Sequence, residues 1–400
     1  MKHIHKSSSS YITNNDYFFF ASKVQEQFLN GKSPIFLSDW NSGSEVSHLH
    51  VIADKAYEAS YYHIDDYYSC DSNFCQKVLS EYISSQWSIY LPQDQIIVGN
   101  NATSLMSYYT QCLMSLGIYN FLAISPLYFT LDDVIKMNGG NITIYQPAMP
   151  HFDIDIIQLR RLIAKDQIQA IIVTQPLFGF GHRITDDEMK NIISLANEYQ
   201  CTIICDFARE GLVWNNDNEM IVFGDQLSLF KGCNKYALIY SPCKKLFANG
   251  IKTAIMIISP EMKQRIVNNA DSVLGTVSAA QLFFLNYILD SDNNETIANH
   301  IRENKKLIYS NYSRIRSLIL DRATIECIRP DEGHYMVCGL PKQSGDTEMF
   351  LELLHQCEIA TLPLSLYRFY NPSTYLFRVN LLLNTFDLTQ AYSRILEHEF

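Results

Sequence analysis

Short runs of apolar residues alternate with amphipathic stretches through the middle of the chain. Nearly continuous apolar runs are typical of strands covered on both faces of a parallel sheet. Seven segments have this character: residues 95–98, 121–124, 142–146, 168–174, 202–206, 236–241 and 253–259. Amphipathic stretches between them, including residues 102–116, 155–165 and 186–199, predict helices. The pattern therefore predicts an α/β fold with a mainly parallel seven-stranded sheet and right-handed crossovers.

The pattern changes after residue 260. Residues 260–289 and 294–320 have a long helical pattern, and short strands and a final helix at 387–397 follow. Together with the N-terminal segment, this part predicts a smaller α+β domain beside the sheet domain. We expect a large domain at residues 50–270 and a small domain made of residues 1–49 and 271–400.

The charge balance narrows the possible partners. The chain has 31 Lys and Arg against 42 Asp and Glu, a net charge of −11, which argues against a nucleic-acid or anionic-membrane surface. Its ten cysteines include no C-x-x-C pair, so we expect reduced thiols and no metal site. Without an apolar run of about 20 residues or the apolar core of a signal peptide, we expect a cytoplasmic protein with no membrane contact.

Lys244 has the most informative surroundings in the chain. It follows the apolar run 236–240, and Gly250 and Lys252 come shortly after it. A buried lysine near other cations loses its proton more easily and can attack an aldehyde. Asp206, at the end of another predicted strand, could keep a pyridine ring nitrogen protonated. These residues predict a site for pyridoxal 5′-phosphate. Lys245 is the alternative Schiff-base residue, and a solvated loop lysine is the simpler interpretation.

Other residues could belong to the same site, although the sequence pattern around each of them is less specific. Ala102 and Thr103 follow a predicted strand and begin a helix, whose N–H groups could bind a phosphate together with Ser241 and Lys252; an ordinary helix cap has the same appearance. Tyr128 follows another strand and could stack on the cofactor ring, although it could also be a core residue. Arg378 lies in an apolar strand and offers a planar fork for an α-carboxylate, unless an acidic side chain pairs with it.

The chain resembles the class I/II aminotransferases, the large fold-type I group of pyridoxal-phosphate enzymes. Ser241, Lys244, Gly250 and Lys252 match the lysine motif of that family, residues 206–209 match its Asp-x-Ala-Tyr stretch, and residues 101–103 match its Gly-Ala-Thr loop. Tyr128 matches its stacking aromatic residue and Arg378 its carboxylate-binding arginine. The resemblance implies a homodimer with sites at the interface. It also implies that Tyr68 or Tyr67 reaches the partner's phosphate and that His334 lies near the substrate.

Two departures from the family pattern affect the cofactor. Phe178 stands where the family has an asparagine, and Arg209 stands where it has a tyrosine; both family residues donate to the phenolic oxygen of the cofactor. Phenylalanine has no donor, whereas arginine has five. We hypothesise that Arg209 contacts this oxygen, the alternative being that it points to solvent or to an acidic loop. Lys252 stands where the family has an arginine, so a single ammonium charge replaces a planar guanidinium that could donate two parallel hydrogen bonds.

The reaction class stays partly open at this level. The resemblance implies transamination between an α-amino acid and a 2-oxo acid. A lyase or a cyclase of secondary metabolism is the alternative, because the contacts to the phenolic oxygen are altered. A catalytically dead binding module is a third possibility. The side chain of the substrate is not indicated, although His48, His50 and His334 are candidate polar groups of the pocket.

Overall fold

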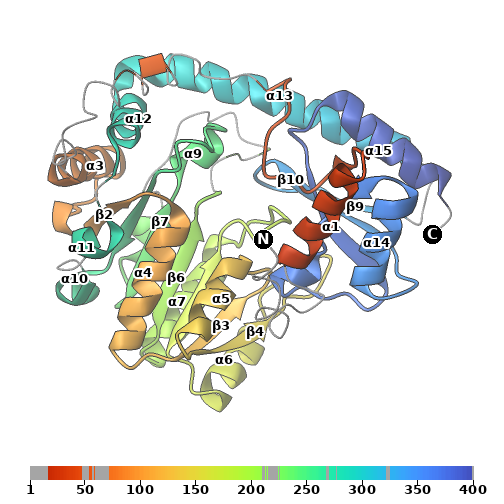
Figure 1. The fold of residues 1–400 in the computed structure, drawn as a ribbon. Coiled ribbons are helices and arrows are strands. Elements are labelled where there is room, and N and C mark those ends of the chain that lie inside the picture. The colour runs from red at the N-terminus through yellow and green to blue at the C-terminus, as the bar shows by residue number, and fades with distance from the viewer. Residues whose placement is uncertain are drawn as a thin grey trace, which may run out of the picture.

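The computed structural model describes residues 17–46, 72–209, 226–266, 270–275, 277–320 and 325–398, with positions 54, 55, 58, 212, 214 and 224. All seven predicted strands are present and form one sheet (Figure 1). The strands are β2 (Ile96–Gly99), β3 (Asn120–Ile124), β4 (Asn141–Tyr145), β5 (Ala170–Thr174), β6 (Thr202–Phe207), β7 (Tyr236–Tyr240) and β8 (Ala254–Ile258). Their order is β2-β8-β7-β6-β5-β3-β4, and only β8 is antiparallel to its neighbours. The mainly parallel seven-stranded sheet is therefore confirmed.

Helices cover both faces of this sheet. Successive strand residues alternate between two apolar clusters: Ile172 packs with α4 (Ala102–Ser115) and α5 (Phe129–Met137), whereas Ile171 packs with α6 (Ile156–Lys165) and α7 (Asp186–Glu198). The alternation follows from the two-residue period of a strand. Because both faces are covered, these strands appear in the sequence as continuous apolar runs. Helix α3 (Ser72–Trp87) contacts β2, and a short helix α8 (Leu227–Phe230) contacts α7.

The helical pattern predicted across residues 260–289 is broken in the structure. It forms α10 (Pro260–Ile266), α11 (Ala270–Leu274) and α12 (Ala279–Leu289). Gly275 follows α11 with φ of +70°, a conformation that ends helices. Ser278 then starts α12 by a reciprocal cap with Gln281. The predicted helical character of this region is therefore present, and these stop and start signals separate α11 from α12.

The C-terminal region forms a second, smaller sheet. Strands β9 (Glu326–Ile328), β10 (Tyr335–Pro341) and β12 (Thr374–Asn380) are antiparallel in the order β12-β10-β9. Helices α13 (Asn294–Leu318), α14 (Asp346–Gln356) and α15 (Thr385–Glu397) surround this sheet. Figure 1 shows α13 running along one side of the molecule from α12 to α15. Three short 3₁₀ helices, Gln93–Gln95, Ser291–Asn293 and Leu364–Tyr367, complete the helical elements of the described chain.

The N-terminal helix α1 (Tyr17–Leu29) lies beside the C-terminal region (Figure 1). The Phe20 ring meets the Phe350 ring of α14 edge to face at 4.8 Å, and β1 (Ile35–Phe36) pairs with β11 (Ile359–Ala360). The two ends of the chain thus share one packing unit, as expected for a small domain. The exact boundaries, 50–270 against 1–49 and 271–400, stay a prediction. Across the described residues, no helix is both long and apolar enough to cross a membrane.

Polar residues gather at one edge of the large sheet. Gly99, Thr174 and Asp206 lie at or next to the carboxyl ends of their strands, and Ser241 follows β7. Lys252 precedes β8, which runs in the opposite direction, so it lies at the same edge. The carboxyl edge is where open α/β sheets bind ligands.

Candidate active site

A cavity of about 580 Å³ opens at this edge of the sheet. Its volume lies in the range of small-molecule and cofactor sites. Nine of the predicted site residues line it: Ala102, Thr103, Tyr128, Phe178, Asp206, Arg209, Ser241, Lys244 and Lys252. Tyr68 and Tyr67, and also His48 and His50, lie outside the described residues. The structure therefore brings most of the predicted residues to one place.

Lys244 sits on a one-turn helix, α9 (Pro242–Lys245), directly after β7. Burial lowers the pKa of its amine to about 8, and the nearby charges of Arg209, Lys252 and Arg378 act in the same direction. A free amine is thus accessible near neutral pH, as a nucleophilic or proton-transferring lysine requires. The alternative, Lys245, is buried and lines only a second, smaller cavity. Of these two neighbouring lysines, Lys244 is the one that lines the large cavity.

Asp206 is the acidic partner in the cavity wall. Its carboxylate accepts a hydrogen bond from the Ala208 N–H at 2.9 Å. Burial raises its pKa, while this hydrogen bond and the charges of Arg209 and Lys244 oppose the rise. A buried carboxylate is costly without a cationic or hydrogen-bonding partner. A protonated ring nitrogen would supply one, so this position fits a pyridine ring.

The N-terminus of α4 faces the same cavity. The Asn101 side chain caps the helix by accepting from the Ser104 N–H at 2.8 Å. The backbone of Asn101 is extended, with φ of −171°, so no glycine is needed here. Ala102 and Thr103 line the cavity, and first-turn N–H groups have no acceptor within a helix. They are available for an anion such as a phosphate.

Gln281, which the sequence analysis missed, joins the two candidate phosphate-binding loops. Its Nε2 donates to the carbonyl oxygens of Asn100 at 3.2 Å and Lys252 at 3.0 Å. By contrast, the Ser241 hydroxyl donates to the Thr253 carbonyl at 3.0 Å. Its proton is therefore directed toward the backbone and not toward the cavity. Among the predicted phosphate ligands, the α4 N-terminus and Lys252 line the cavity, whereas the Ser241 hydroxyl is already engaged by the backbone.

Arg378 is completely buried among aromatic rings. Its guanidinium carbon lies 3.9 Å from the centre of the Trp40 ring and 4.3 Å from that of Tyr335. Nη2 donates to the Ser38 carbonyl at 2.6 Å, whereas Nε and Nη1 have no hydrogen-bond partner. No described acidic side chain forms an ion pair with it, so the alternative of a structural acid has no support in this part of the chain.

Arg209 lies against the same rings. Its guanidinium carbon is 4.6 Å from the Tyr335 ring centre, 5.4 Å from Phe178 and 5.5 Å from Trp40. These are cation–π distances. It lines the large cavity, and no hydrogen bond or ion pair joins its side chain to another described residue. Trp40, which lies just after β1, was not anticipated as a site residue.

His334 lies near the same cations but in the smaller cavity of about 20 Å³, together with Lys244 and Arg209. Its ring packs against Tyr335 at 4.3 Å and Phe247 at 5.6 Å. Burial, followed by the charges of Arg209, Lys244 and Arg378, lowers its pKa well below the usual value. His334 is therefore neutral at physiological pH.

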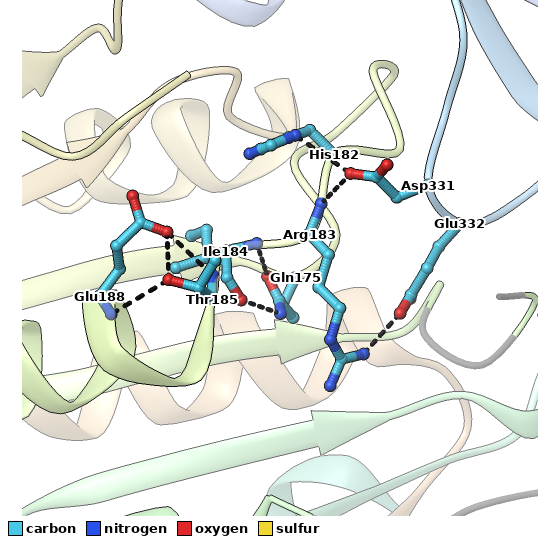
Figure 2. Close-up of polar contacts among 8 residues, drawn as sticks. All are labelled: Gln175, His182, Arg183, Ile184, Thr185, Glu188, Asp331 and Glu332. Carbon is cyan, nitrogen blue, oxygen red and sulfur yellow. Dashed lines mark hydrogen bonds and ion pairs between the residues drawn. The ribbon is translucent and has the colours of Figure 1, made fainter. Parts of the chain in front are cut away.

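The segment at residues 175–181, which carries Phe178, is part of a well-anchored loop, whose polar contacts Figure 2 shows. The Gln175 side chain bonds both backbone groups of Ile184 at 2.9 and 3.0 Å. Arg183 forms an ion pair with Glu332, and His182 lies 3.1 Å from Asp331. This network fixes the loop that carries Phe178 to the segment just before Tyr335. It thereby holds two of the rings that surround the arginines.

Backbone contacts add to the network. The Gly181 carbonyl accepts from the N–H groups of Asp331 at 3.0 Å and Glu332 at 2.9 Å. Gly181 has φ of +65°, and a Cβ there would come within 2.2 Å of the Glu332 carbonyl oxygen. Only glycine fits this close approach.

Aromatic side chains form the remaining wall, which we call the aromatic rim: Tyr17, Trp40 and Phe129. The Tyr17 and Phe129 rings stack at 5.1 Å. Tyr17 comes from α1 and Phe129 from α5, so only the tertiary fold brings them together. Thr174, also in the lining, could have been identified because it ends a parallel strand.

The site has two parts that we name for their charged residues. The lysine end contains Lys244, Asp206, Lys252 and the start of α4. The arginine end contains Arg209, Arg378 and the rings of Trp40, Phe178 and Tyr335. Within the described residues, no group of three or more His, Cys, Asp or Glu side chains could hold a metal ion.

Comparisons with known proteins agree with this geometry. The family described as aminotransferase class I and II matches residues 63–395. A 1-aminocyclopropane-1-carboxylate synthase from Nicotiana tabacum is 22% identical over an alignment of 276 residues that covers 64% of this chain. The chain spans about half the length of this curated relative, 54%.

Solved structures share the fold over almost the whole chain. The aspartate aminotransferase of Thermotoga maritima matches with a TM-score of 0.78 and 15% identity, over 96% of each chain. A single mutant of the Thermus thermophilus aspartate aminotransferase matches with a TM-score of 0.80 and 13% identity, over 98% of this chain and 97% of that one. At these identities the likeness concerns the fold.

Proposed function

Because this chain belongs to the class I and II aminotransferases, whose members use pyridoxal 5′-phosphate, we propose that it transfers the amino group of an α-amino acid to a 2-oxo acid with this cofactor. Its architecture is the fold-type I arrangement of the solved aminotransferases. The proposal follows from the family, and the described cavity supports it.

One observation supports the proposal most directly: a lysine, Lys244, and an acid, Asp206, line the same cavity. Burial lowers the lysine pKa to about 8 and raises that of the aspartate. Bound between them, the cofactor would act as an electron sink for the substrate Cα. A lysine without a neighbouring acid would fit many other sites, whereas this combination fits a protonated pyridine ring beside an amine.

Each residue then has a separate task. Lys244 Nζ, when unprotonated, takes the proton from the substrate Cα. Asp206 holds a proton on the ring nitrogen by charge and hydrogen bonding. The N–H groups of Ala102 and Thr103, with the Lys252 ammonium, bind the phosphate, and Tyr128 covers the ring. Arg378 binds the α-carboxylate through Nε and Nη1, the two donors that have no protein partner.

The aromatic rim favours an uncharged substrate side chain. The rings of Tyr17 and Phe129 offer apolar surface and no charge. Each described cation of the lining already has a task at the lysine end or the arginine end. We therefore infer that the side chain is apolar and large enough to reach these rings.

The family suggests two further properties. We propose a homodimer with sites at the interface, in which Tyr68 or Tyr67 reaches the phosphate of the partner subunit. We also propose a cytoplasmic location, in line with the nine described cysteines, all of which are free thiols. Sedimentation analysis of the purified protein tests the dimer.

A panel of amino acids tests the reaction. Purified protein with bound cofactor is mixed with each common α-amino acid, and the cofactor spectrum and the released products are followed. Conversion of the cofactor to its amine form, with release of the matching 2-oxo acid, supports transamination. A protein that stays colourless when the cofactor is added, and releases nothing, contradicts enzymatic function and favours a binding module.

A second candidate is a lyase or cyclase. It is favoured by the match to the tobacco 1-aminocyclopropane-1-carboxylate synthase, named for a ring-containing product, and by Phe178 and Arg209 in place of the usual donors. The same panel separates the two reactions. Ammonia or a cyclic amino acid, with the cofactor retained in its aldehyde form, supports this candidate against transamination.

A further inference from the structure

Two guanidinium groups share one set of aromatic rings at the arginine end. Arg209 lies 4.6 Å and Arg378 lies 4.3 Å from the centre of the Tyr335 ring, so their guanidinium carbons are no more than about 9 Å apart. Both also lie over Trp40 and Phe178, at 3.9 to 5.7 Å. Like charges at this spacing repel one another in a poorly solvated site.

Neither cation is neutralised by a described side chain. Arg378 forms no ion pair there, and its Nε and Nη1 are buried without partners. Two described carboxylates lie near the arginines and Lys244: Asp206, whose charge interacts with Arg209 and Lys244, and Glu332, which is paired with Arg183. Buried charges and donors are costly unless something pairs with them. Within the described part of the chain, the arginine end therefore has donors on Arg378 that no acceptor meets.

The two arginines differ in their access to the cavity. Arg209 lines the large cavity and is partly exposed, whereas Arg378 is fully covered. The Trp40 ring, at 3.9 Å, lies closest to the Arg378 guanidinium. An anion that enters from the cavity meets Arg209 first. Arg378 itself does not line this cavity, whereas Trp40, whose ring stacks on its guanidinium, does.

We propose that Arg209 and Arg378 form a single two-guanidinium site for the substrate carboxylate: Arg209 receives it at the cavity wall, and Arg378 binds it when Trp40 moves aside. The inference rests on the proposed function, because it concerns the carboxylate of the same amino acid. It gives Arg209 a substrate-binding role in place of the cofactor contact hypothesised from the sequence.

The dimensions suit a carboxylate. Each oxygen can accept at about 2.7–2.9 Å from a guanidinium nitrogen, and one carboxylate can therefore bridge two guanidinium groups whose carbons lie within about 9 Å. The planar faces of the guanidinium groups stack on the rings while their N–H edges stay free for hydrogen bonds. Such a site selects α-amino acids strongly over the corresponding amines, which lack the carboxylate.

A pair of unreactive probes tests the proposal on the holoenzyme. Phenylpropanoate carries the carboxylate without an amino group, and phenylpropanamide is its uncharged analogue. By calorimetry we expect Arg209→Gln to weaken phenylpropanoate binding about tenfold to a hundredfold, the size of a lost charge-assisted contact. Binding of the amide should change less than twofold. Arg329→Gln is the matched control, because Arg329 stacks at 5.5 Å on Trp214, outside the site.

A double variant shows whether the arginines act on one carboxylate. If they do, Arg209→Gln and Arg378→Gln together weaken phenylpropanoate binding by clearly less than the product of the single effects. Phenylpropanoate should also change the fluorescence of the wild type, and Trp40→Phe should lose this change. Effects that multiply independently, or an unchanged affinity in Arg209→Gln, overturn the proposal.

The outcomes separate this inference from the proposed function. If Arg209→Gln leaves phenylpropanoate affinity unchanged but shifts the pH midpoint of the cofactor spectrum, Arg209 contacts the phenolic oxygen of the cofactor, and the carboxylate proposal is wrong. If reduction with borohydride attaches no cofactor to Lys244 in the wild type, the proposed function itself fails. Carboxylate binding is measured without turnover and does not depend on that second result.

Discussion

The lysine end and the arginine end of the cavity are built in different ways. At the lysine end, Asp206 lies near the end of β6, Lys244 follows the adjacent strand β7, and most other groups lie within a few residues of a strand end. At the arginine end, Trp40, Arg209, Tyr335 and Arg378 come from distant parts of the chain and meet only through the packing of the second sheet. The first end is local to one sheet, and the second depends on tertiary contacts.

The electrostatic balance differs in the same way. At the lysine end a cation and an acid line one cavity, and the charge of Lys244 opposes the rise that burial causes in the pKa of Asp206. At the arginine end two cations face aromatic rings, and no described acid pairs with them. The comparison indicates that the lysine end supports the reaction itself, whereas the arginine end is prepared for an anion brought by the substrate.

Removal of the Lys244 amine should have the largest effect. We expect Lys244→Ala to lower the rate of amino-group transfer by about a thousandfold or more, because a positioned general base contributes about 10²–10⁴. Carboxylate binding at the arginine end should stay within about twofold. Stopped-flow absorbance and calorimetry measure the two quantities. A parallel loss of both would show that the ends are not independent.

Loss of the Arg183 guanidinium should loosen the arginine end through its support. Arg183 pairs with the fully buried Glu332 carboxylate. We expect Arg183→Gln to lower the free energy of unfolding by about 3 kcal/mol, as for other broken buried pairs, and to weaken phenylpropanoate binding without preventing attachment of the cofactor to Lys244. Urea unfolding measures the stability.

The matched control for Arg183 is a surface pair. Lys190 and Asp187 form an ion pair in which both side chains are mostly exposed, 58% and 88%. Lys190→Gln should leave the unfolding free energy unchanged within experimental error, because exposed ion pairs contribute little. Equal effects of the two substitutions would contradict a special role for the loop network.

The lowered pKa of Lys244 predicts a pH-dependent stability of the cofactor-free protein. The folded state holds this proton with a pKa of about 8, and the unfolded chain with about 10.5. Between these values the unfolded chain binds more protons, so stability rises with pH. We expect Lys244→Met to be more stable than wild type at pH 7, by up to about 3 kcal/mol, and the difference to vanish near pH 11. A difference that does not change with pH would show that the amine is not buried as described.

The smallest effect is expected at the aromatic rim. Tyr17→Ala removes a ring that stacks on Phe129 and should weaken phenylpropanoate binding about fivefold, which corresponds to about 1 kcal/mol, while binding of butanoate stays the same. Phe18→Ala is the control, since Phe18 is the next residue of α1 and is 69% exposed. Equal losses for both carboxylates would mean that the rim does not contact the substrate side chain.

The lysine end could be anticipated from the sequence because the ends of strands can be located from the local pattern of apolar residues. Continuous apolar runs located the strands, and the residues that follow them, such as Lys244 and Asp206, met at one edge. Ser241 lines the cavity, but its hydroxyl donates to the Thr253 carbonyl. No local pattern could have indicated that.

The arginine end could be anticipated only in part. Arg378 was notable as a cation in an apolar strand, whereas Trp40 and Tyr17 have no local signal, because their rings reach the cavity only after the N-terminal segment packs on the C-terminal region. Gln281 was missed for a related reason: its side chain contacts the carbonyl oxygens of Asn100 and Lys252, which are far from it in the sequence. The apolar periodicity and the positions of strand ends do not predict contacts between segments that are far apart in the sequence.

The most direct test is chemical. Purified protein is incubated with pyridoxal 5′-phosphate, reduced with borohydride, digested and analysed by mass spectrometry. The account predicts a phosphopyridoxyl group on Lys244, in the peptide that also contains Lys245, and its absence from Lys244→Ala. Attachment to Lys245 or to any other lysine, or no attachment at all, would contradict the assignment on which both ends of the site depend.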